Sequence, residues 1–519
     1  MSPPRGAGAR PDSLIGGLAA NYAGKAFNAL LSLATLPILY RQLGSEAFGL
    51  FGVFFSFQVL LSVFDFGVGA AMQRDLAAWQ SAPLDAEVRH VLPTLRWIEG
   101  VLAAIGLAAI ALGWLGSHWI ATGWLHVQGL ELDLVARAIG WMAVAAALQF
   151  VGSFQVGCLN GLRRHRQASA LQAGTWALRF ALVLLCARVG SAPAGSVPQA
   201  IVPVLQAWAF ANAVQLVGAG LLLRHGLPAP GAAPHRVGEA VRYGLPLVAA
   251  TTLIMLFNQA DKLAASKLLP LETVGRYTIV WSIAEVMYLM YQPIYTSFLP
   301  VFCSRRATAA RAGDAAGLWQ SADLAWRVMT LVVLPVAAML LAVPGLVIHA
   351  WTGDAELAVE GGAVLRWVIV GATVNAFLVI PFALQQAGGD VLPWTWRIAA
   401  ALPLYLPLAL ASVHAYGIVG GAACWCLGSV ALALWLAQAT GKCVPARPQS
   451  APLLAHLAPL SKPTFLACAA VGAFSAFLPP TQDRWVAGLL SIAVLAACGA
   501  AAVGSQRAFV AGAVSRWRR

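Results

Sequence analysis

Long apolar segments dominate the sequence and limit what it can fold into. Runs of about 20 or more largely apolar residues recur along the chain, and a helix of that length crosses the hydrocarbon core of a bilayer. Of the 519 residues, 60% are hydrophobic and only 10% are charged, whereas about a quarter of the residues of a soluble domain are charged. The composition excludes a water-soluble domain, a disordered chain and a secreted disulfide scaffold. The sequence predicts an all-α polytopic membrane protein.

The apolar runs form two groups of six and a final pair, so about 14 transmembrane helices are predicted. A break rich in Arg, His and Pro separates the two groups, and a proline-rich stretch precedes the last pair. The predicted organisation is a cytoplasmic N-terminal tail (1–14), a first lobe (15–223), a cytoplasmic linker (224–243), a second lobe (244–440), a cytoplasmic linker (441–463), two C-terminal spans (464–504) and a basic cytoplasmic tail (505–519).

The distribution of basic residues predicts the orientation. With the N-terminus in the cytoplasm, the two tails and the even-numbered loops hold about three times as many Lys and Arg residues as the opposite side. Both termini are therefore expected in the cytoplasm. The formal net charge of +13 is then explained by cations beside anionic lipid headgroups. Membrane lipids are predicted partners, and nucleic acid is not.

An internal repeat links the two predicted lobes. The segment RQLGSEAFGLFGVFFS at 41–56 aligns with KLLPLETVGRYTIVWS at 267–282, and both segments join the first and second spans of a lobe. The matched positions are Arg41 with Lys267, Leu43 with Leu269, Glu46 with Glu272, Gly49 with Gly275, Phe51 with Tyr277 and Ser56 with Ser282. Six spans per lobe make the repeats parallel, an arrangement that favours a central cavity between two bundles.

Charged residues inside the spans are the best candidates for function, because a charge at the bilayer centre costs about 3 kcal/mol. Seven such residues would together cost roughly 20 kcal/mol in lipid, so most must face protein or water. They are Lys25, Asp65, Glu99, Arg179, Asp261, Lys262 and Glu285. Polar or aromatic residues at helical spacing share faces with several of them, namely Asn21, Asn28, Asn258, Trp281, Tyr288 and Gln292.

Two interpretations of these residues are open. In the first, they line a hydrated cavity in which Lys25, Arg179 and Lys262 bind an anionic substrate, while Asp65, Asp261 and Glu285 carry protons or sodium. In the second, residues such as Asp261 and Lys262 are buried pairs that only neutralise each other. Tyrosines at helical spacing are also common in ordinary packing.

The remaining motifs give no chemistry. The sequence has no phosphate loop, HExxH or GxSxG motif, and neither the histidines nor the cysteines have metal-ligand spacing. We therefore expect no cofactor, no metal site and no enzymatic activity. Gly417 and Gly421 form a GxxxG pair that is typical of close helix packing. The segment from Arg305 to Arg327 suits a connector or a helix on the cytoplasmic surface.

Several segments resemble a known family. They are the run from Asn21 through Pro37 to Arg41, LGSEAFGLF at 43–51, FDFGVG at 64–69 and GLPLVAATTLIMLFNQADKLAASKLLPLETVGRYT at 244–278. These segments look like the polysaccharide-export branch of the MOP flippase superfamily, with lipopolysaccharide O-antigen flippases of the Wzx type as the most similar members. The resemblance covers the first two and the seventh and eighth spans best.

The resemblance implies two six-helix lobes with a V-shaped cavity and two added C-terminal helices. It also implies that the protein moves a polyprenyl-pyrophosphate-linked oligosaccharide across the bacterial inner membrane by alternating access, with Asn258, Asp261, Lys262 and Lys25 at the site. Other polysaccharide assembly proteins are further candidate partners. A multidrug or cation antiporter of the same superfamily and a lipid II flippase are the alternatives. A membrane glycosyltransferase would need a large external loop, which the sequence lacks.

Overall fold

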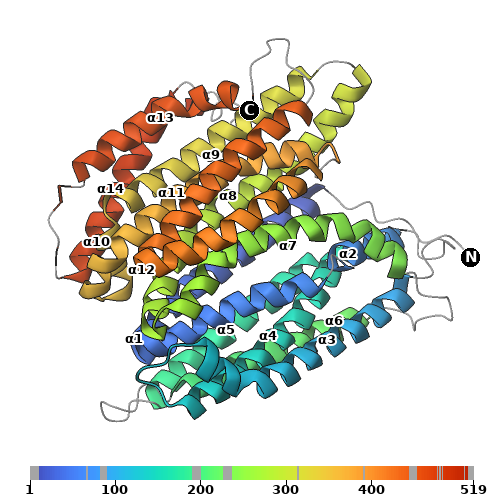
Figure 1. Ribbon diagram of the computed structural model, residues 1–519. Coiled ribbons are helices and arrows are strands. Elements are labelled where there is room, and N and C mark those ends of the chain that lie inside the picture. The colour runs from blue at the N-terminus through green and yellow to red at the C-terminus, as the bar shows by residue number, and fades with distance from the viewer. Residues whose placement is uncertain are drawn as a thin grey trace, which may run out of the picture. The chain divides into compact units, whose positions relative to one another are not determined.

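The computed structural model describes residues 11–65, 68–81, 91–189, 200–225, 237–312, 315–389, 392–443, 453–475, 477–478, 481, 483–507 and 509–511. Helices make up nearly all of these residues, as Figure 1 shows. The chain divides into two compact units. The first comprises residues 1–50 and 54–248, and the second comprises residues 51–53 and 249–519.

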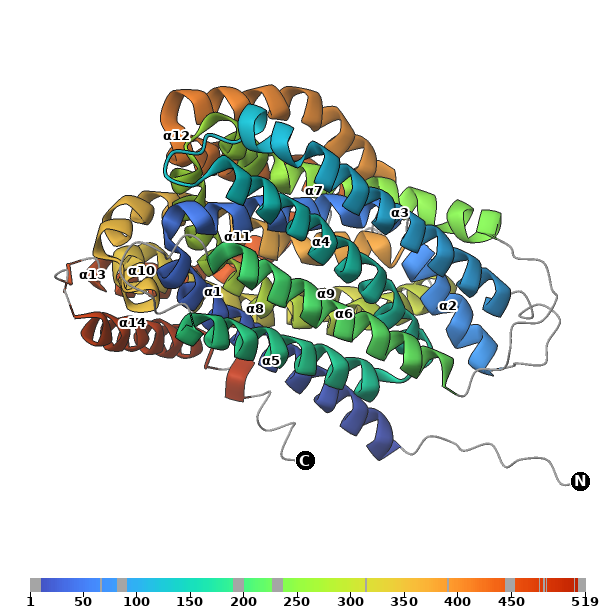
Figure 2. The same ribbon diagram turned by 90° about the horizontal axis from the view of Figure 1, so that it is seen from below.

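The first unit is built from six long helices. They are α1 (Pro11–Ser62), α2 (Val68–Ser81), α3 (Val91–Trp119), α4 (Leu132–Gly161), α5 (His165–Val189) and α6 (Ile201–Arg224), and short 3-10 and π turns follow α1 (Val63–Asp65) and α3 (Ile120–Trp124). Helix α4 packs between α3 and α6, and α5 packs against α6 (Figure 2). Because neighbouring helices cover α4, most of its residues are buried.

The second unit contains the remaining helices. They are α7 (Val237–Leu268), which begins in the first unit, α8 (Leu271–Ala312), α9 (Ala316–Ala342), α10 (Pro344–Thr352), α11 (Ala355–Gln386), α12 (Leu392–Cys443), α13 (Leu453–Ser475) and α14 (Arg484–Ser505). Helices α13 and α14 lie side by side against α9 (Figure 1). In the described part of the chain, nine helical stretches are long and apolar enough to cross a membrane, and α7 and α8, which carry the charged residues, are not among them.

Two of the long helices each contain a tight reversal at a glycine. Gly44 in α1 and Gly417 in α12 have positive φ angles of 77° and 59°, a backbone region that glycine enters without steric cost. The rings of Tyr40 and Phe48 have centroids only 5.5 Å apart, although eight residues of straight helix rise about 12 Å. Each helix is therefore two spans joined by a turn, which agrees with the spans predicted on either side of these glycines.

The turn at Gly417 changes the interpretation of the GxxxG pair. A methyl group built on Gly420 would lie 2.1 Å from the carbonyl oxygen of Ser412, which shows that the chain folds back on itself there. Gly417 makes this turn, and Gly421 lies beside Asp261 and Tyr277. Gly417 thus makes a hairpin, whereas Gly421 allows the close packing against α7 and α8 that the motif predicts.

Three predicted boundaries differ from the structure. Helix α8 continues to Ala312 and α9 starts at Ala316, so the segment from Arg305 to Arg327 consists of two helix ends. Trp319 and Trp326 are buried, which explains why these tryptophans do not mark a surface helix. Helix α13 begins at Leu453, within the stretch assigned to a linker because of its prolines.

The glutamate of the internal repeat makes a polar contact in both units. In the first unit, Glu46 accepts hydrogen bonds from the backbone N–H groups of Gln128 and Gly129, at 2.6 and 3.0 Å from Oε1. In the second unit, the matching Glu272 binds Arg276 at 3.0 Å, and Arg276 binds Glu356 and Glu360 at 3.3 and 2.6 Å. In the first unit the acid itself binds the connection between the third and fourth spans, whereas in the second unit Glu272 binds Arg276 within α8, and Arg276 contacts the start of α11.

The reversal at Gly417 can be tested by replacing it with alanine. Gly417→Ala should lower the free energy of unfolding by about 1–2 kcal/mol, because an alanine Cβ is strained at positive φ. Gly499 in α14 is a matched control, since a methyl group there also meets nothing within 4 Å and its φ is not positive. Unfolding curves of the purified chain in detergent measure both effects. Equal stability of the two variants would contradict the turn.

Candidate functional site

A buried carboxylate lies at the centre of the polar cluster in the second unit. Asp261 of α7 is 0% exposed and accepts a hydrogen bond from the hydroxyl of Tyr277 on α8. Its other oxygen, Oδ1, is buried and has no hydrogen-bond partner. The hydroxyl of the buried Tyr405 on α12 also has none. The Asp261 carboxylate therefore accepts one side-chain hydrogen bond, from the neutral hydroxyl of Tyr277, and its Oδ1 atom can accept another.

Lys262 does not form a salt bridge with its neighbour. Consecutive residues of a helix point about 100° apart, and the Lys262 ammonium lies 3.9 Å from the centroid of the Trp281 ring. Within the described ranges, no carboxylate lies within salt-bridge distance of Lys262. Its positive charge lies against the electron-rich face of an indole ring, and it also interacts electrostatically, without direct contact, with the carboxylates of Asp261 and Glu285.

Aromatic and amide groups fix the ring under Lys262. Trp281 makes an edge-to-face contact with Trp425 of α12 at 4.6 Å between centroids, and Trp425 Nε1 donates a hydrogen bond of 3.1 Å to Asn258 of α7. Space for Trp425 is provided by Gly371 of α11, where a methyl group would lie 2.4 Å from the ring. Helices α7, α8, α11 and α12 together therefore position the cation site.

One face of α8 is polar and exposed. Glu285 is exposed and Tyr288, one turn further on, is 51% exposed, while Gln292 is half-buried on the next turn. These residues lie in the middle of the predicted eighth span. An exposed carboxylate at that depth is too costly in lipid, so this face of α8 must contact water.

In the first unit, Arg179 of α5 is enclosed. It is 4% exposed, and its guanidinium lies between the rings of Trp176 and Trp208, 4.8 and 4.9 Å from their centroids. Nη2 donates to Gln149 Oε1 at 2.7 Å and to Asn212. No carboxylate in the part of the chain described by the structure pairs with it. Arg179 is thus a buried cation without an anionic partner.

The other predicted residues are distributed along the first unit. Asp65 ends the turn after α1 and accepts hydrogen bonds of 3.2 and 3.3 Å from the backbone N–H of Gly69, at the start of α2. Asn28 has a buried Oδ1 without a partner. Asn21 and Lys25 belong to α1, but their side chains lie outside the described residues.

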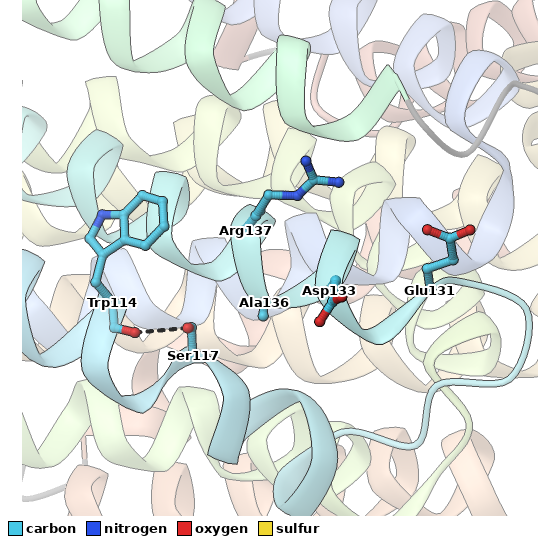
Figure 3. A pocket seen from close by; sticks show the side chains of 6 residues that line it. All are labelled: Trp114, Ser117, Glu131, Asp133, Ala136 and Arg137. Carbon is cyan, nitrogen blue, oxygen red and sulfur yellow. Dashed lines mark hydrogen bonds between the residues drawn. The ribbon is translucent and has the colours of Figure 1, made fainter.

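A polar pocket in the first unit contains none of the predicted site residues. Figure 3 shows it between the end of α3 and the start of α4, lined by Trp114, Ser117, Glu131, Asp133, Ala136 and Arg137. Ser117 donates to the carbonyl oxygen of Trp114 at 2.8 Å. The pocket lies at helix ends, next to the connection that Glu46 anchors.

Several residues of both clusters were not identified from the sequence. Tyr277 donates to Asp261 from the next helix, and Trp425 and Tyr405 come from α12, more than 140 residues along the chain. Gln149 and Asn212 bind Arg179 from α4 and α6. Spacing along one helix cannot identify such partners, because the contacts join different helices. Of these residues, Tyr277 alone lay within segments that the sequence singled out, namely the internal repeat and the resembling segment at 244–278.

Comparison with known proteins places the chain in a family. The family described as polysaccharide biosynthesis protein matches residues 15–305, which is more than half of the chain. The chain belongs to the polysaccharide biosynthesis protein family. The match includes Arg179, Asp261, Lys262 and the exposed face of α8. No curated protein matches the sequence.

Solved structures show the same fold at low sequence identity. The lipid II flippase MurJ, in an inward closed conformation, has a TM-score of 0.68 and 12% identity, over 94% of this chain and 99% of MurJ. An inward-facing multidrug resistance MATE transporter of the MOP superfamily has a TM-score of 0.66 and 16% identity, over 84% of this chain and 96% of that chain. A MOP superfamily transporter from Pyrococcus furiosus has a TM-score of 0.57 and 16% identity, over 80% of this chain and 92% of that chain.

The family and the fold together confirm the resemblance drawn from the sequence. This member of the polysaccharide biosynthesis protein family is a multi-pass, all-helical membrane protein with the fold of MOP superfamily transporters. The proteins that share the fold are named as flippases and transporters. The roles of individual residues stay predictions.

The hydrogen bond between Tyr277 and Asp261 can be tested by removing one hydroxyl. Tyr277→Phe should lower the free energy of unfolding by about 1–3 kcal/mol, because it leaves a buried carboxylate without its donor. Tyr291→Phe on the same helix is the control, since Tyr291 contacts Tyr288 through its ring. Unfolding of both variants is measured in detergent. A similar stability of the two variants would show that the bond contributes little.

Proposed function

We propose that the protein translocates a polyprenyl-pyrophosphate-linked oligosaccharide, such as an O-antigen or other surface polysaccharide repeat unit, across the bacterial inner membrane by alternating access. Both termini would lie in the cytoplasm. The family match supports a role in polysaccharide biosynthesis. The observation that carries the proposal is the exposed face of α8 in the middle of the predicted span, together with the ammonium of Lys262, which forms no salt bridge within the described ranges.

The substrate's chemistry fits this face. A pyrophosphate is a compact anion that binds cations, and Lys262 offers an ammonium that forms no salt bridge with a described residue. The sugars need a wet surface, which the exposed Glu285 and Tyr288 provide. The polyprenyl chain is apolar and would remain in the lipid. Translocation breaks no covalent bond, so the protein would need no catalytic residue.

Two further cations belong to the proposed substrate site. Lys25 is assigned to the substrate site because it lies in the segment of α1 that resembles the flippase family. Arg179 is enclosed by Trp176 and Trp208, so it would contact a substrate only after one of these rings moves. In the observed arrangement its contribution is a fixed positive charge within the first unit, which attracts an anion at a distance in a medium of low dielectric constant.

Release of a tightly held pyrophosphate requires a competing event. We propose that the loss of H⁺ or Na⁺ from Asp261 supplies it. Asp261 is adjacent to Lys262 in the chain and retains one oxygen without a partner, so it can accept a proton or a cation. Binding of either ion removes a negative charge beside Lys262 and favours an anion there, whereas loss of the ion restores the charge and repels the bound pyrophosphate. The bond to Tyr277 would transmit the change from α7 to α8.

Two alternatives use the same fold. Lipid II also carries a pyrophosphate on a polyprenyl chain, so the same cations would bind it, and the lipid II flippase MurJ has this fold. A multidrug antiporter would use the acids Asp261 and Glu285 to bind organic cations, and MATE transporters also have this fold. Translocation of an organic cation, but of no lipid-linked sugar, would favour the antiporter.

The proposal predicts that removing the charge of Lys262 slows translocation. Lys262→Ala should reduce the rate for a polyprenyl-pyrophosphate oligosaccharide in liposomes by about 10- to 100-fold, as expected for the loss of one charge-assisted contact of about 1.5–3 kcal/mol. Lys262→Arg should retain most of the rate, because it keeps the charge. Lys267→Ala is the control, since Lys267 lies in the last turn of the same helix.

Arg179→Met separates a functional charge from a structural one. The variant also removes the donor of the Gln149 and Asn212 amide oxygens, so its free energy of unfolding should fall by about 1–3 kcal/mol. Its translocation rate per amount of folded protein should be lower than that of the wild type. If Lys262→Ala and Arg179→Met both translocate at the rate of Lys267→Ala, the cation assignment is wrong.

A further inference from the structure

The exposed side chains of α8 form a combination suited to carbohydrate. Tyr288 presents half of its surface to solvent. Its ring makes an edge-to-face contact with the ring of Tyr291, with 5.3 Å between the ring centroids and 78° between the ring planes. Glu285 precedes Tyr288 by about one turn, and Gln292 follows by about one turn, so all three share one face of the helix. An open aromatic ring thus lies between a carboxylate and an amide.

Each of these groups has a defined partner on a sugar. The C–H bonds on one side of a pyranose ring are slightly positive and pack against the negative face of an aromatic ring. The ring hydroxyls both donate and accept hydrogen bonds. A carboxylate accepts them, and an amide both accepts and donates. Phosphate has no apolar face, so it would gain nothing from Tyr288.

Ordinary packing and lipid contact do not account for Tyr288. A tyrosine used for packing is covered by its neighbours, whereas half of this side chain is exposed. In the apolar middle of the bilayer, its hydroxyl would lack a partner, and the carboxylate of Glu285 on the same face would be costly. Tyrosines that contact lipid prefer the membrane–water interface instead.

We propose that Tyr288 is a stacking platform for a sugar ring of the transported glycolipid, and that Glu285 and Gln292 bind the hydroxyls of that ring. The proposal rests on the proposed function and names the part of the substrate that each residue contacts. Trp281, which lies under Lys262, precedes Tyr288 by about 10 Å along the helix axis. A pyrophosphate at Lys262 therefore leaves the first sugars beside Tyr288.

The test compares two substrates in liposomes that contain the full chain: polyprenyl pyrophosphate with its oligosaccharide and polyprenyl pyrophosphate without sugar. Tyr288→Leu should slow the glycosylated substrate by about 3- to 10-fold, as expected for loss of aromatic stacking, and leave the sugar-free substrate unchanged. Tyr288→Phe, which keeps the ring, should retain the wild-type rate for both. Tyr416→Leu is the matched control, because Tyr416 is 76% exposed elsewhere on α12.

The outcomes separate the platform from the proposed function. If Lys262→Ala slows the translocation of both substrates while Tyr288→Leu slows neither, the site binds pyrophosphate, and the proposal that Tyr288 stacks on a sugar ring is wrong. Equal slowing of both substrates by Tyr288→Leu also overturns the platform, because it shows a structural role. If the wild-type protein translocates neither substrate, the proposed function fails and the platform fails with it. Selective slowing of the glycosylated substrate supports both.

Discussion

The cost of placing a charge in the middle of a bilayer governs the whole structure. At about 3 kcal/mol for each charge, every ionised side chain in a span needs protein or water around it, and the protein uses both. Arg179 is enclosed by two tryptophans and two amides, and Asp261 by a tyrosine. Glu285 is left exposed and Lys262 half-exposed. The enclosed charges are held by the packing of their own units, and the exposed Glu285 and half-exposed Lys262 mark the face of α8 that is proposed to contact water.

The two units repeat an architecture but differ in chemistry. Each begins with a reversal followed by a glutamate, which in the first unit binds the connection between the third and fourth spans and in the second unit binds Arg276, which contacts the start of α11. In the first unit the buried polar network is centred on a cation, Arg179, and in the second on an anion, Asp261, next to a cation in the chain. In the aligned segments, Phe51 of α1 corresponds to Tyr277 of α8, whose added hydroxyl gives Asp261 its donor.

The sequence predicted the features that depend on local patterns. Hydropathy predicted the long apolar helices, including the two that meet near Gly417, because each satisfies its backbone hydrogen bonds within one helix, whereas α7 and α8 are not among the described stretches apolar enough to cross a membrane. Residues at helical spacing on α8 were correctly placed on one face. Contacts between helices, such as Trp425 with Asn258, were beyond prediction, because they depend on how the helices pack. The enclosure of Arg179 was missed for the same reason, and the buried Trp319 and Trp326 show that an aromatic, basic segment need not lie on a surface.

The most direct test of the account measures water access at position 285. In a variant without native cysteines, Glu285→Cys should react with a membrane-impermeant thiol reagent, and an added polyprenyl-pyrophosphate oligosaccharide should protect it. Cys substituted for the buried Ile283 on the same helix should remain unreactive. If position 285 is as unreactive as position 283, the middle of α8 is dry, and the proposed passage for a hydrophilic substrate along this face is wrong.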